Sequence, residues 1–189
     1  MVGLISLTVL VVVLIYFIMI YNSLVSIKNN VGKAWANIDV LLKQRHDELP
    51  KLIDTCKQYM QYEQETLEKV INARARVASA RESQNMVALG AAEGALRAGL
   101  GSLFALVESY PELKANENFL HLQARISGLE NSIADRREFF NEIVNINNVR
   151  IEQFPDLVVA RMMNFRTFDM LRFETAELTD VDVSGRFKG

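Results

Sequence analysis

This sequence of 189 residues has little cysteine and little proline, and neither positive nor negative charge is in marked excess. The single cysteine, Cys56, excludes an intramolecular disulfide framework and argues against a zinc site built on thiolates. Three prolines and nine glycines favour long uninterrupted helices over a turn-rich β fold. Lys and Arg number 21 against 23 Asp and Glu, so the chain lacks the basic excess that phosphate binding needs. We therefore expect no nucleic-acid partner.

Catalytic and metal-binding signatures are also missing. A carboxylate-bridged metal pair in a helical bundle needs Glu-x-x-His on two helices, but Lys43 and Asn118 stand three residues before His46 and His121. The zinc-protease, phosphate-loop and Gly-x-Ser-x-Gly motifs do not occur. Glu117 and His121 lie one helical turn apart, and an exposed i,i+4 pair is favoured over a two-ligand metal site. We expect no catalysis, no cofactor and no metal.

What is present begins with a long apolar run, because the first 27 residues carry no charged side chain. As a helix, residues 1–21 span about 31 Å, the thickness of the hydrocarbon core of a bilayer. Tyr16 and Tyr21 lie toward the end of this run, where amphipathic rings favour the membrane interface. A cleaved signal peptide would need a basic start, a shorter apolar stretch and a small-x-small site, which the run lacks. We predict a transmembrane anchor over residues 1–21.

The orientation of this anchor follows from the cations beside it. No lysine or arginine precedes the run, whereas Lys28 and Lys33 follow it closely. The positive-inside rule therefore predicts a single-pass protein of the plasma membrane, with its N-terminus outside and the remaining residues in the cytoplasm. The lipid bilayer is the first expected partner.

Beyond the anchor, apolar residues recur at alternating spacings of three and four, the pattern of helices packed in a left-handed bundle. We predict an all-α fold in which the transmembrane helix continues into a long antiparallel four-helix bundle over residues 22–165, with coiled-coil-like packing. The predicted helices cover residues 22–48, 50–81, 86–110, 116–149 and a short 156–165.

Local signals set the limits of these helices. Leu49-Pro50 is expected to end the first one, because the residue before a proline avoids helical angles. Tyr110-Pro111 is expected to end the third, and Asn116 is a suitable N-cap for the fourth. The remaining residues, 166–189, are expected to form a C-terminal tail with an alternating apolar pattern at Leu178, Val181, Val183 and Phe187.

A row of small residues recurs every four positions in the predicted third helix: Gly90, Gly94, Ala98 and Ser102. On a helix this spacing forms a ridge that lets another backbone approach closely, which would suit self-association. The same glycines would also weaken the helix by about 1 kcal/mol each relative to alanine. The sequence leaves both interpretations open, and the ridge is the candidate interface of a homo-oligomer.

A candidate buried charge lies in the predicted fourth helix, where Arg136 falls between Ile133 and Phe140 on the apolar stripe. A buried guanidinium must be paired, and counting levels along the bundle places Arg136 beside the carboxylates from Glu63 to Glu68. The alternative is that its long stem carries the charge out to solvent.

Three other features receive structural interpretations. Cys56 lies on the apolar stripe of the second helix and is expected to be a buried, inert thiol. Trp35 lies on the stripe of the first helix and is expected in the core. The charged run from Arg45 to Glu48 is expected to form a solvated corner between two helices.

Several long motifs carry a family resemblance. They read YNSLVSIKNNV at residues 21–31, AWANIDVLLKQRHD at 34–47 with Pro50, and YPELKANENF at 110–119. Glu65–Val70, Ala73–Ala75, Glu130, Arg136-Arg137 and Phe154-Pro155 continue the pattern. Over residues 16–165 the chain resembles the LemA family, and the residues that match its signature include Trp35, Asp39, Pro50, Pro111 and Asn141. Departures occur at Glu48-Leu49, at Phe139-Phe140 and in the tail after Phe165.

The resemblance implies a bacterial single-pass membrane protein with a cytoplasmic helical bundle, and it supplies no established reaction. One branch of the family resembles proteins of magnetosome membranes, and others are associated with membrane-protease neighbours. We therefore favour a membrane-anchored, self-associating scaffold. The alternatives are an adaptor or sensor for a membrane protease or another membrane protein, and an enzyme whose deep polar pocket the sequence does not reveal.

Overall fold

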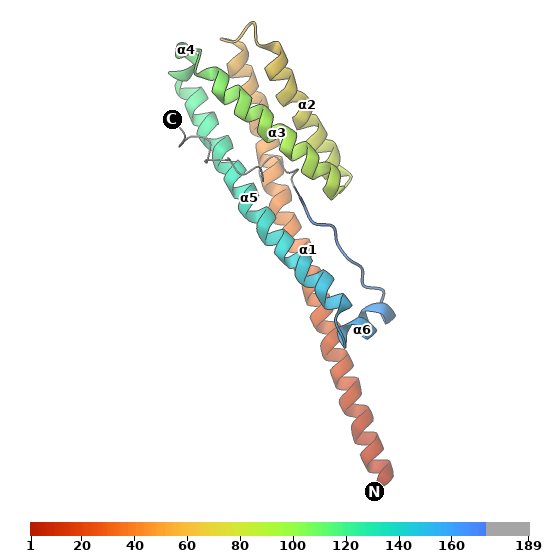
Figure 1. Ribbon diagram of the computed structural model, residues 1–189. Helices are drawn as coiled ribbons and strands as arrows, with labels where there is room; N and C mark the ends of the chain where they lie inside the picture. Colours follow the sequence, from red (N-terminus) through yellow and green to blue (C-terminus); the bar gives the residue numbers. More distant parts are fainter. Residues whose placement is uncertain (173–189) are drawn as a thin grey trace, which may run out of the picture. The chain divides into compact units, whose positions relative to one another are not determined.

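The computed structural model describes residues 1–172, in which six helices and their connections occur and no strand. The all-α prediction is confirmed over this part of the chain (Figure 1). The predicted alternation of Leu178, Val181, Val183 and Phe187 lies outside the described residues. In chain order the helices are α1 (Val2–Lys57), α2 (Gln64–Glu82), α3 (Met86–Val107), α4 (Pro111–Lys114), α5 (Glu117–Glu152) and α6 (Asp156–Met162).

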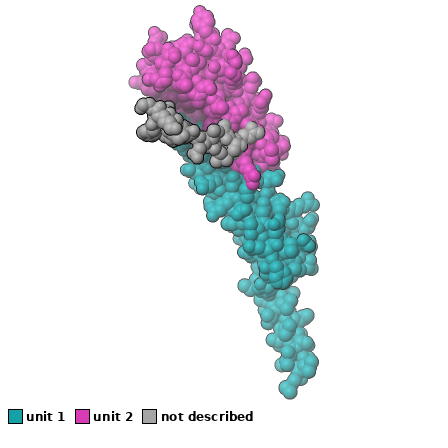
Figure 2. Space-filling view, viewed as in Figure 1, with its two compact units in different colours: residues 1–45, 127–170 teal, residues 46–126, 171–189 magenta. Residues whose placement is uncertain are grey.

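The chain divides into two compact units, which Figure 2 shows in different colours. Unit 1 comprises Met1–Arg45 and Ser127–Met170, and therefore holds most of α1, most of α5, and α6. Unit 2 comprises His46–Ile126 and the chain from Leu171, and holds the end of α1, all of α2, α3 and α4, and the start of α5. Within unit 2, α2 packs against α3.

The predicted break at Leu49-Pro50 is wrong, because α1 contains Pro50 and ends only at Lys57. A proline inside a helix has no N–H to donate to the carbonyl four residues earlier, which here belongs to His46. The structure supplies another donor, since Arg74 Nε of α2 lies 3.0 Å from the His46 carbonyl oxygen. The orphaned carbonyl is thus satisfied, and the predicted helices 22–48 and 50–81 become Val2–Lys57 and Gln64–Glu82.

The replacement of the missing Pro50 N–H by Arg74 leads to a prediction about stability. Arg74→Met should lower the free energy of unfolding by about 1–3 kcal/mol, because it leaves the His46 carbonyl without a donor. In a Pro50→Ala background the same change should cost less, since alanine at position 50 restores the N–H that the carbonyl lacks. Urea unfolding of the four chains in detergent, followed by circular dichroism, measures the difference. Equal costs in both backgrounds would mean that Arg74 does not replace the missing helical bond.

The other helix limits follow local chemistry. The Asn85 side chain caps α3 by accepting a hydrogen bond from the Ala88 N–H at 3.0 Å. Pro111 occupies the first turn of α4, where its missing N–H costs nothing. Asn116 is confirmed as the cap before α5, because its Oδ1 accepts from the Phe119 N–H at 3.0 Å.

Each unit buries apolar side chains from several helices. In unit 1, Ile20 and Leu24 of α1 pack with Ile151 of α5 and with Val159 and Ala160 of α6. In unit 2 the fully buried side chains come from α1 through to α5 and include Leu52, Met60, Leu89, Leu96, Leu103, Leu113 and Phe119. Cys56 belongs to this second core, as predicted.

Candidate functional site

The first feature with functional meaning is the exposed apolar surface of α1. Every residue from Met1 to Tyr16 is exposed, although the segment contains only apolar side chains, two small hydroxyls and one tyrosine. Ser6 and Thr8 direct their hydroxyls to backbone carbonyls of their own helix, at 3.0 and 2.9 Å, which hides these polar groups from an apolar surrounding. In the described part of the chain, α1 holds the one segment long and apolar enough to cross a membrane.

The end of this segment packs against the rest of unit 1. Phe17 is partly buried against the cluster that α6 makes with Ile20 and Leu24. The Tyr21 ring meets Phe165 edge to face, with centroids 6.2 Å apart. The lipid-exposable part of α1 therefore gives way to packed structure between Phe17 and Leu24.

A polar network ties α5 and α6 to the same turn of α1. Arg150 of α5 donates from Nε to Asp156, at the start of α6, and from Nη2 to Ser23 Oγ of α1 at 3.2 Å. Asp156 is buried and Arg150 is partly exposed. Because one guanidinium bridges three segments, α6 is fixed against α1 by charge as well as by apolar packing. No sequence pattern predicts this network, since Ser23 and Arg150 are 127 positions apart.

The buried arginine of unit 1 is Arg45, not Arg136. Arg136 is exposed, so its predicted burial beside Glu63 is wrong. From Ile133 the stripe of α5 passes through position 137 to Phe140, and position 136 faces solvent. Arg45 is only 1% exposed and its Nη1 donates to Glu130 Oε1 at 2.6 Å.

The Arg45–Glu130 ion pair also overturns the prediction of a solvated corner from Arg45 to Glu48. Because α1 does not turn at Pro50, Arg45 stays on the buried stripe between Leu42 and Leu49. Glu48 is largely shielded and accepts hydrogen bonds from Lys51 and, at 3.2 Å, from Arg125 of α5. The Lys51 and Arg125 side chains hold the pKa of Glu48 below its usual value.

His46 marks the start of unit 2 and is clamped by Arg74. The guanidinium Nη2 lies 2.7 Å from His46 Nε2, which must accept because arginine only donates. This assigns the proton of the neutral ring to Nδ1. Burial, followed by the Arg74 charge, lowers the pKa of His46 below 6.5.

The depressed pKa of His46 predicts a pH dependence. Below about pH 6.5 the unfolded chain binds a proton at His46, whereas the folded chain binds it only at lower pH because its pKa is lowered. The contribution of His46 to stability is therefore present above pH 6.5 and is lost as the pH falls through the folded-state pKa. His46→Gln keeps an acceptor for Arg74 but does not titrate. We expect it to flatten the loss of melting temperature between about pH 7 and pH 5, while the exposed His121→Gln should not.

Four other residues singled out in the sequence are half-buried: Trp35, Asp39, Glu63 and Asn141. Trp35 is half-buried and its ring contacts Phe140 with centroids 6.0 Å apart. Asp39 and Asn141, both in unit 1, are half-buried. Glu63 is half-buried in unit 2, where Tyr110 donates to it at 3.4 Å.

The small-residue ridge of α3 is only partly open. A side-chain carbon on Gly90 would lie 1.8 Å from the Arg172 carbonyl oxygen, so this end of the ridge is packed against the chain's own backbone. Gly94 is half-buried, whereas Ala98 and Ser102 are exposed. Ala98 and Ser102 line a groove of about 340 Å³ whose other walls include Lys69 and Arg76 of α2.

Within residues 1–172 no three His, Cys, Asp or Glu side chains gather where they could hold a metal ion. Glu117 and His121 are both exposed, in keeping with a surface pair. Burial raises the pKa of Cys56 to about 11, which leaves this thiol protonated at neutral pH.

These observations define a class: an all-helical protein whose N-terminal helix can cross a membrane and continues without a break into a packed helical body. A model of the LemA family matches residues 34–184, and the chain belongs to that family. The resemblance seen in its motifs is thereby confirmed.

Individual relatives agree with this assignment. The chain is 27% identical to Protein LemA of Metamycoplasma hominis over 164 residues, which cover 86% of this chain and 74% of that protein. It is 29% identical to Magnetosome protein MamQ 2 of Paramagnetospirillum magneticum and 30% identical to Magnetosome protein MamQ of Magnetospirillum gryphiswaldense. Each of these two matches spans 94 residues, half of this chain and 35% of the magnetosome protein.

Proposed function

We propose that this chain is a single-pass bacterial membrane protein that self-associates and acts as a scaffold, without catalysis. In this proposal residues 1–21 cross the plasma membrane with the N-terminus outside, and the helices that follow form an antiparallel four-helix bundle in the cytoplasm. Lys28 and Lys33 support this orientation, because they closely follow the apolar segment and the positive-inside rule places such cations in the cytoplasm.

The observation that carries the proposal is the unbroken course of α1. Its first 16 residues expose an apolar surface whose contact with water is unfavourable, and the same helix continues to Lys57 in unit 2. A helix that is anchored at one end and packed at the other suits a protein that holds a folded body at a membrane. The partial match to two proteins named for the magnetosome supports an organising role.

The open half of the small-residue ridge supports self-association. Ala98 and Ser102 leave room for a helix of a second copy to approach α3, because neither side chain extends far from the backbone. Ser102 Oγ donates to the Ala98 carbonyl at 3.1 Å, so its polar group is already satisfied and does not oppose close packing.

Mass measurement in mild detergent tests the proposal. We expect the native chain to be oligomeric and Ala98→Leu to shift it to monomeric mass with an unchanged melting transition, because three added carbons block the approach of a second copy. Ala75→Leu makes the same change at an exposed position of α2 outside the groove and should keep the oligomer. A native chain of monomeric mass would refute self-association.

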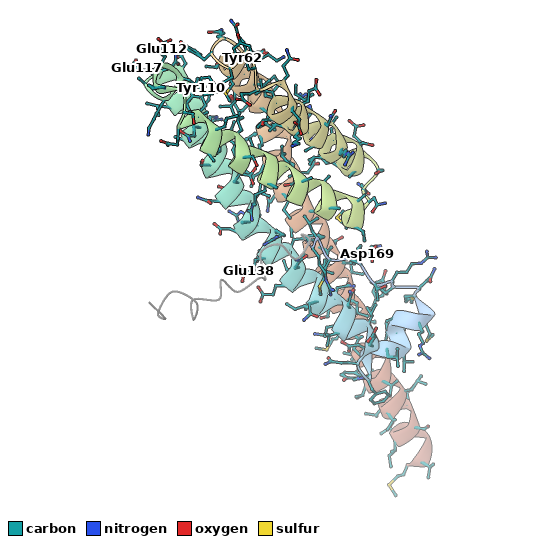
Figure 3. The ribbon with its side chains drawn as sticks, turned by 45° about the horizontal axis from the view of Figure 1, so that its top comes forward. Tyr62, Tyr110, Glu112, Glu117, Glu138 and Asp169 are labelled. Atoms are coloured by element: carbon teal, nitrogen blue, oxygen red, sulfur yellow. The ribbon has the colours of Figure 1, made fainter. Side chains whose placement is uncertain are left out.

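The adaptor remains the second candidate because of one exposed aromatic. Tyr62, between α1 and α2, is 92% exposed, and Figure 3 shows it at the same end of unit 2 as Tyr110, Glu112 and Glu117. Aromatic side chains are enriched at protein interfaces. A single dominant co-purifying protein that is lost in Tyr62→Ser, and kept in Ala98→Leu, would favour an adaptor over a scaffold.

A further inference from the structure

The segment around α6 exposes apolar side chains that its own unit does not cover. Phe154 is 84% exposed and Met162 69%, and Val158 and Met163 are each about half exposed. Val158 and Met162 lie one helical turn apart on α6, while Val159 and Ala160 are buried. The outward face of this short helix therefore carries two large apolar side chains, Val158 and Met162, beside the exposed Arg161, a mixture typical of segments that lie in a membrane interface.

The position of α6 along α1 suggests what covers this face. Its buried residues pack on Ile20 and Leu24, and the same cluster includes Phe17. Figure 1 shows α6 beside α1. Phe17 stands four positions before Tyr21, the last residue of the apolar run. The contact of α6 with α1 therefore lies within about 6 Å of the end of that run along the helix axis. Amphipathic segments that lie in a membrane interface are buried by about 5–10 Å, which is the same depth.

A groove beside α6 is lined by two cations, and one of them, Lys28, lies on α1 just beyond the apolar run. Its volume is about 610 Å³, and its lining includes Lys28 of α1, Arg166, and the rings of Tyr21, Phe165 and Phe168. Lys28 stands seven residues beyond Tyr21, about 10 Å along the helix, in the region of the lipid headgroups. Lys28 and Arg166 are exposed, so both can reach a phosphate.

Side-chain amides of α5 fix the wall of this groove. Asn148 pairs with the Phe168 backbone twice, accepting from its N–H at 3.0 Å and donating to its carbonyl at 2.9 Å. Asn147 donates to the Arg166 carbonyl at 3.3 Å. These hydrogen bonds hold the backbone that follows α6, including that of Arg166, against α5.

We propose that the segment from Phe154 to Phe168 lies in the membrane interface, with Phe154, Val158 and Met162 inserted among the acyl chains and the Lys28–Arg166 groove occupied by the phosphate of an anionic lipid. This inference rests on the proposed membrane anchor. It adds a second membrane contact that depends on lipid charge, and it sets the depth and tilt of α1 through the Arg150 network.

Depth-dependent quenching in proteoliposomes tests the apolar contact. The full chain is reconstituted in phosphatidylcholine mixed with phosphatidylglycerol, and one introduced cysteine carries an environment-sensitive dye. Cys56 is fully buried and stays unlabelled. The labelled positions are Val158→Cys, Met162→Cys, the exposed Glu138→Cys of α5 as control, and Leu10→Cys in the apolar run as a reference for the anchor.

We expect lipids brominated on their acyl chains to quench the dye at 10, 158 and 162, and not at 138. Quenching at 10 without quenching at 158 or 162 would overturn this inference and leave the anchor intact. No quenching at 10 would overturn the anchor itself. Protection of 158 and 162 from aqueous iodide without quenching by brominated lipid would show that protein, such as a second copy, covers this face.

The charged groove is tested in the same vesicles. Quenching at 158 should be stronger with phosphatidylglycerol than with phosphatidylcholine alone, and Lys28→Gln with Arg166→Gln should remove that difference. Lys33→Gln, an exposed cation outside the groove, should keep it. Inorganic phosphate at a constant ionic strength should compete weakly, and complete competition would show that the groove takes free phosphate in place of a lipid. A double variant that keeps the difference would overturn the assignment of the groove.

Discussion

Replacing Arg45 with alanine is expected to lower the free energy of unfolding by about 3–5 kcal/mol, because it leaves a shielded carboxylate without its partner. Arg45 is 1% exposed, Glu130 is 16% exposed, and their nearest nitrogen and oxygen atoms are 2.6 Å apart. Urea unfolding in detergent, followed by circular dichroism, measures the loss. A loss below about 1 kcal/mol would match an exposed ion pair and contradict burial.

Two matched variants separate charge from packing. Arg136→Ala removes the same side chain from an exposed position in the same unit, and should change the free energy of unfolding by no more than about 0.5 kcal/mol. Arg45→Met combined with Glu130→Leu removes both charges and keeps most of the volume. The double variant should recover most of the loss, since apolar replacement of a whole buried pair is often neutral or stabilising.

The contrast between Arg45 and Arg136 shows what an apolar stripe can and cannot predict. Both arginines stand three and four residues from flanking apolar positions, so spacing alone treats them alike. Arg45 is 1% exposed and pairs with Glu130 of α5, whereas Arg136 is exposed. On α5, positions 136 and 137 are both one turn from Ile133, and the packing selects 137. The choice between adjacent positions depends on neighbouring helices, which periodicity does not describe.

Helix identity was more predictable than helix limits. The apolar run at the N-terminus and the cap at Asn116 depend on residues within a turn or two of themselves, so the sequence was sufficient to predict them. Pro50 is different, because its effect depends on Arg74, a donor 24 positions later. A local rule that ends a helix before proline fails wherever a distant side chain satisfies the freed carbonyl.

Only part of the exposed apolar surface of unit 1 could be predicted from the sequence. The exposed face of α1 follows from composition, and the predicted antiparallel bundle returns the end of the fourth helix toward Leu24, where Ile151 packs. The seating of α6 on Ile20 and Leu24 has no signal in the sequence. That placement depends on the Arg150 bridge to Ser23 and Asp156, which joins residues from three helices. Networks of this kind are formed by tertiary packing and leave no periodic signal.

Replacing Gly90 with alanine is expected to destabilise the chain by about 1.5–3 kcal/mol, although alanine is the better helix former. The added carbon would lie 1.8 Å from the carbonyl oxygen and 2.9 Å from the carbonyl carbon of Arg172, and a backbone cannot yield as a flexible side chain does. Displacing Arg172 would pull its neighbour Leu171, which is fully buried, out of the core of unit 2. Thermal melting in detergent measures the loss.

Gly101→Ala is the control, because it makes the same change in the same helix where no atom lies within 4 Å. It should stabilise the chain by about 0.5–1 kcal/mol through helix propensity, so the two substitutions should have opposite signs. Effects of the same sign would mean that Arg172 is not seated on Gly90. Oligomeric mass decides the remaining question about the ridge: if Gly90→Ala lowers stability and keeps the oligomer, Gly90 serves packing within one chain, and Ala98 and Ser102 remain as the surface for a second copy.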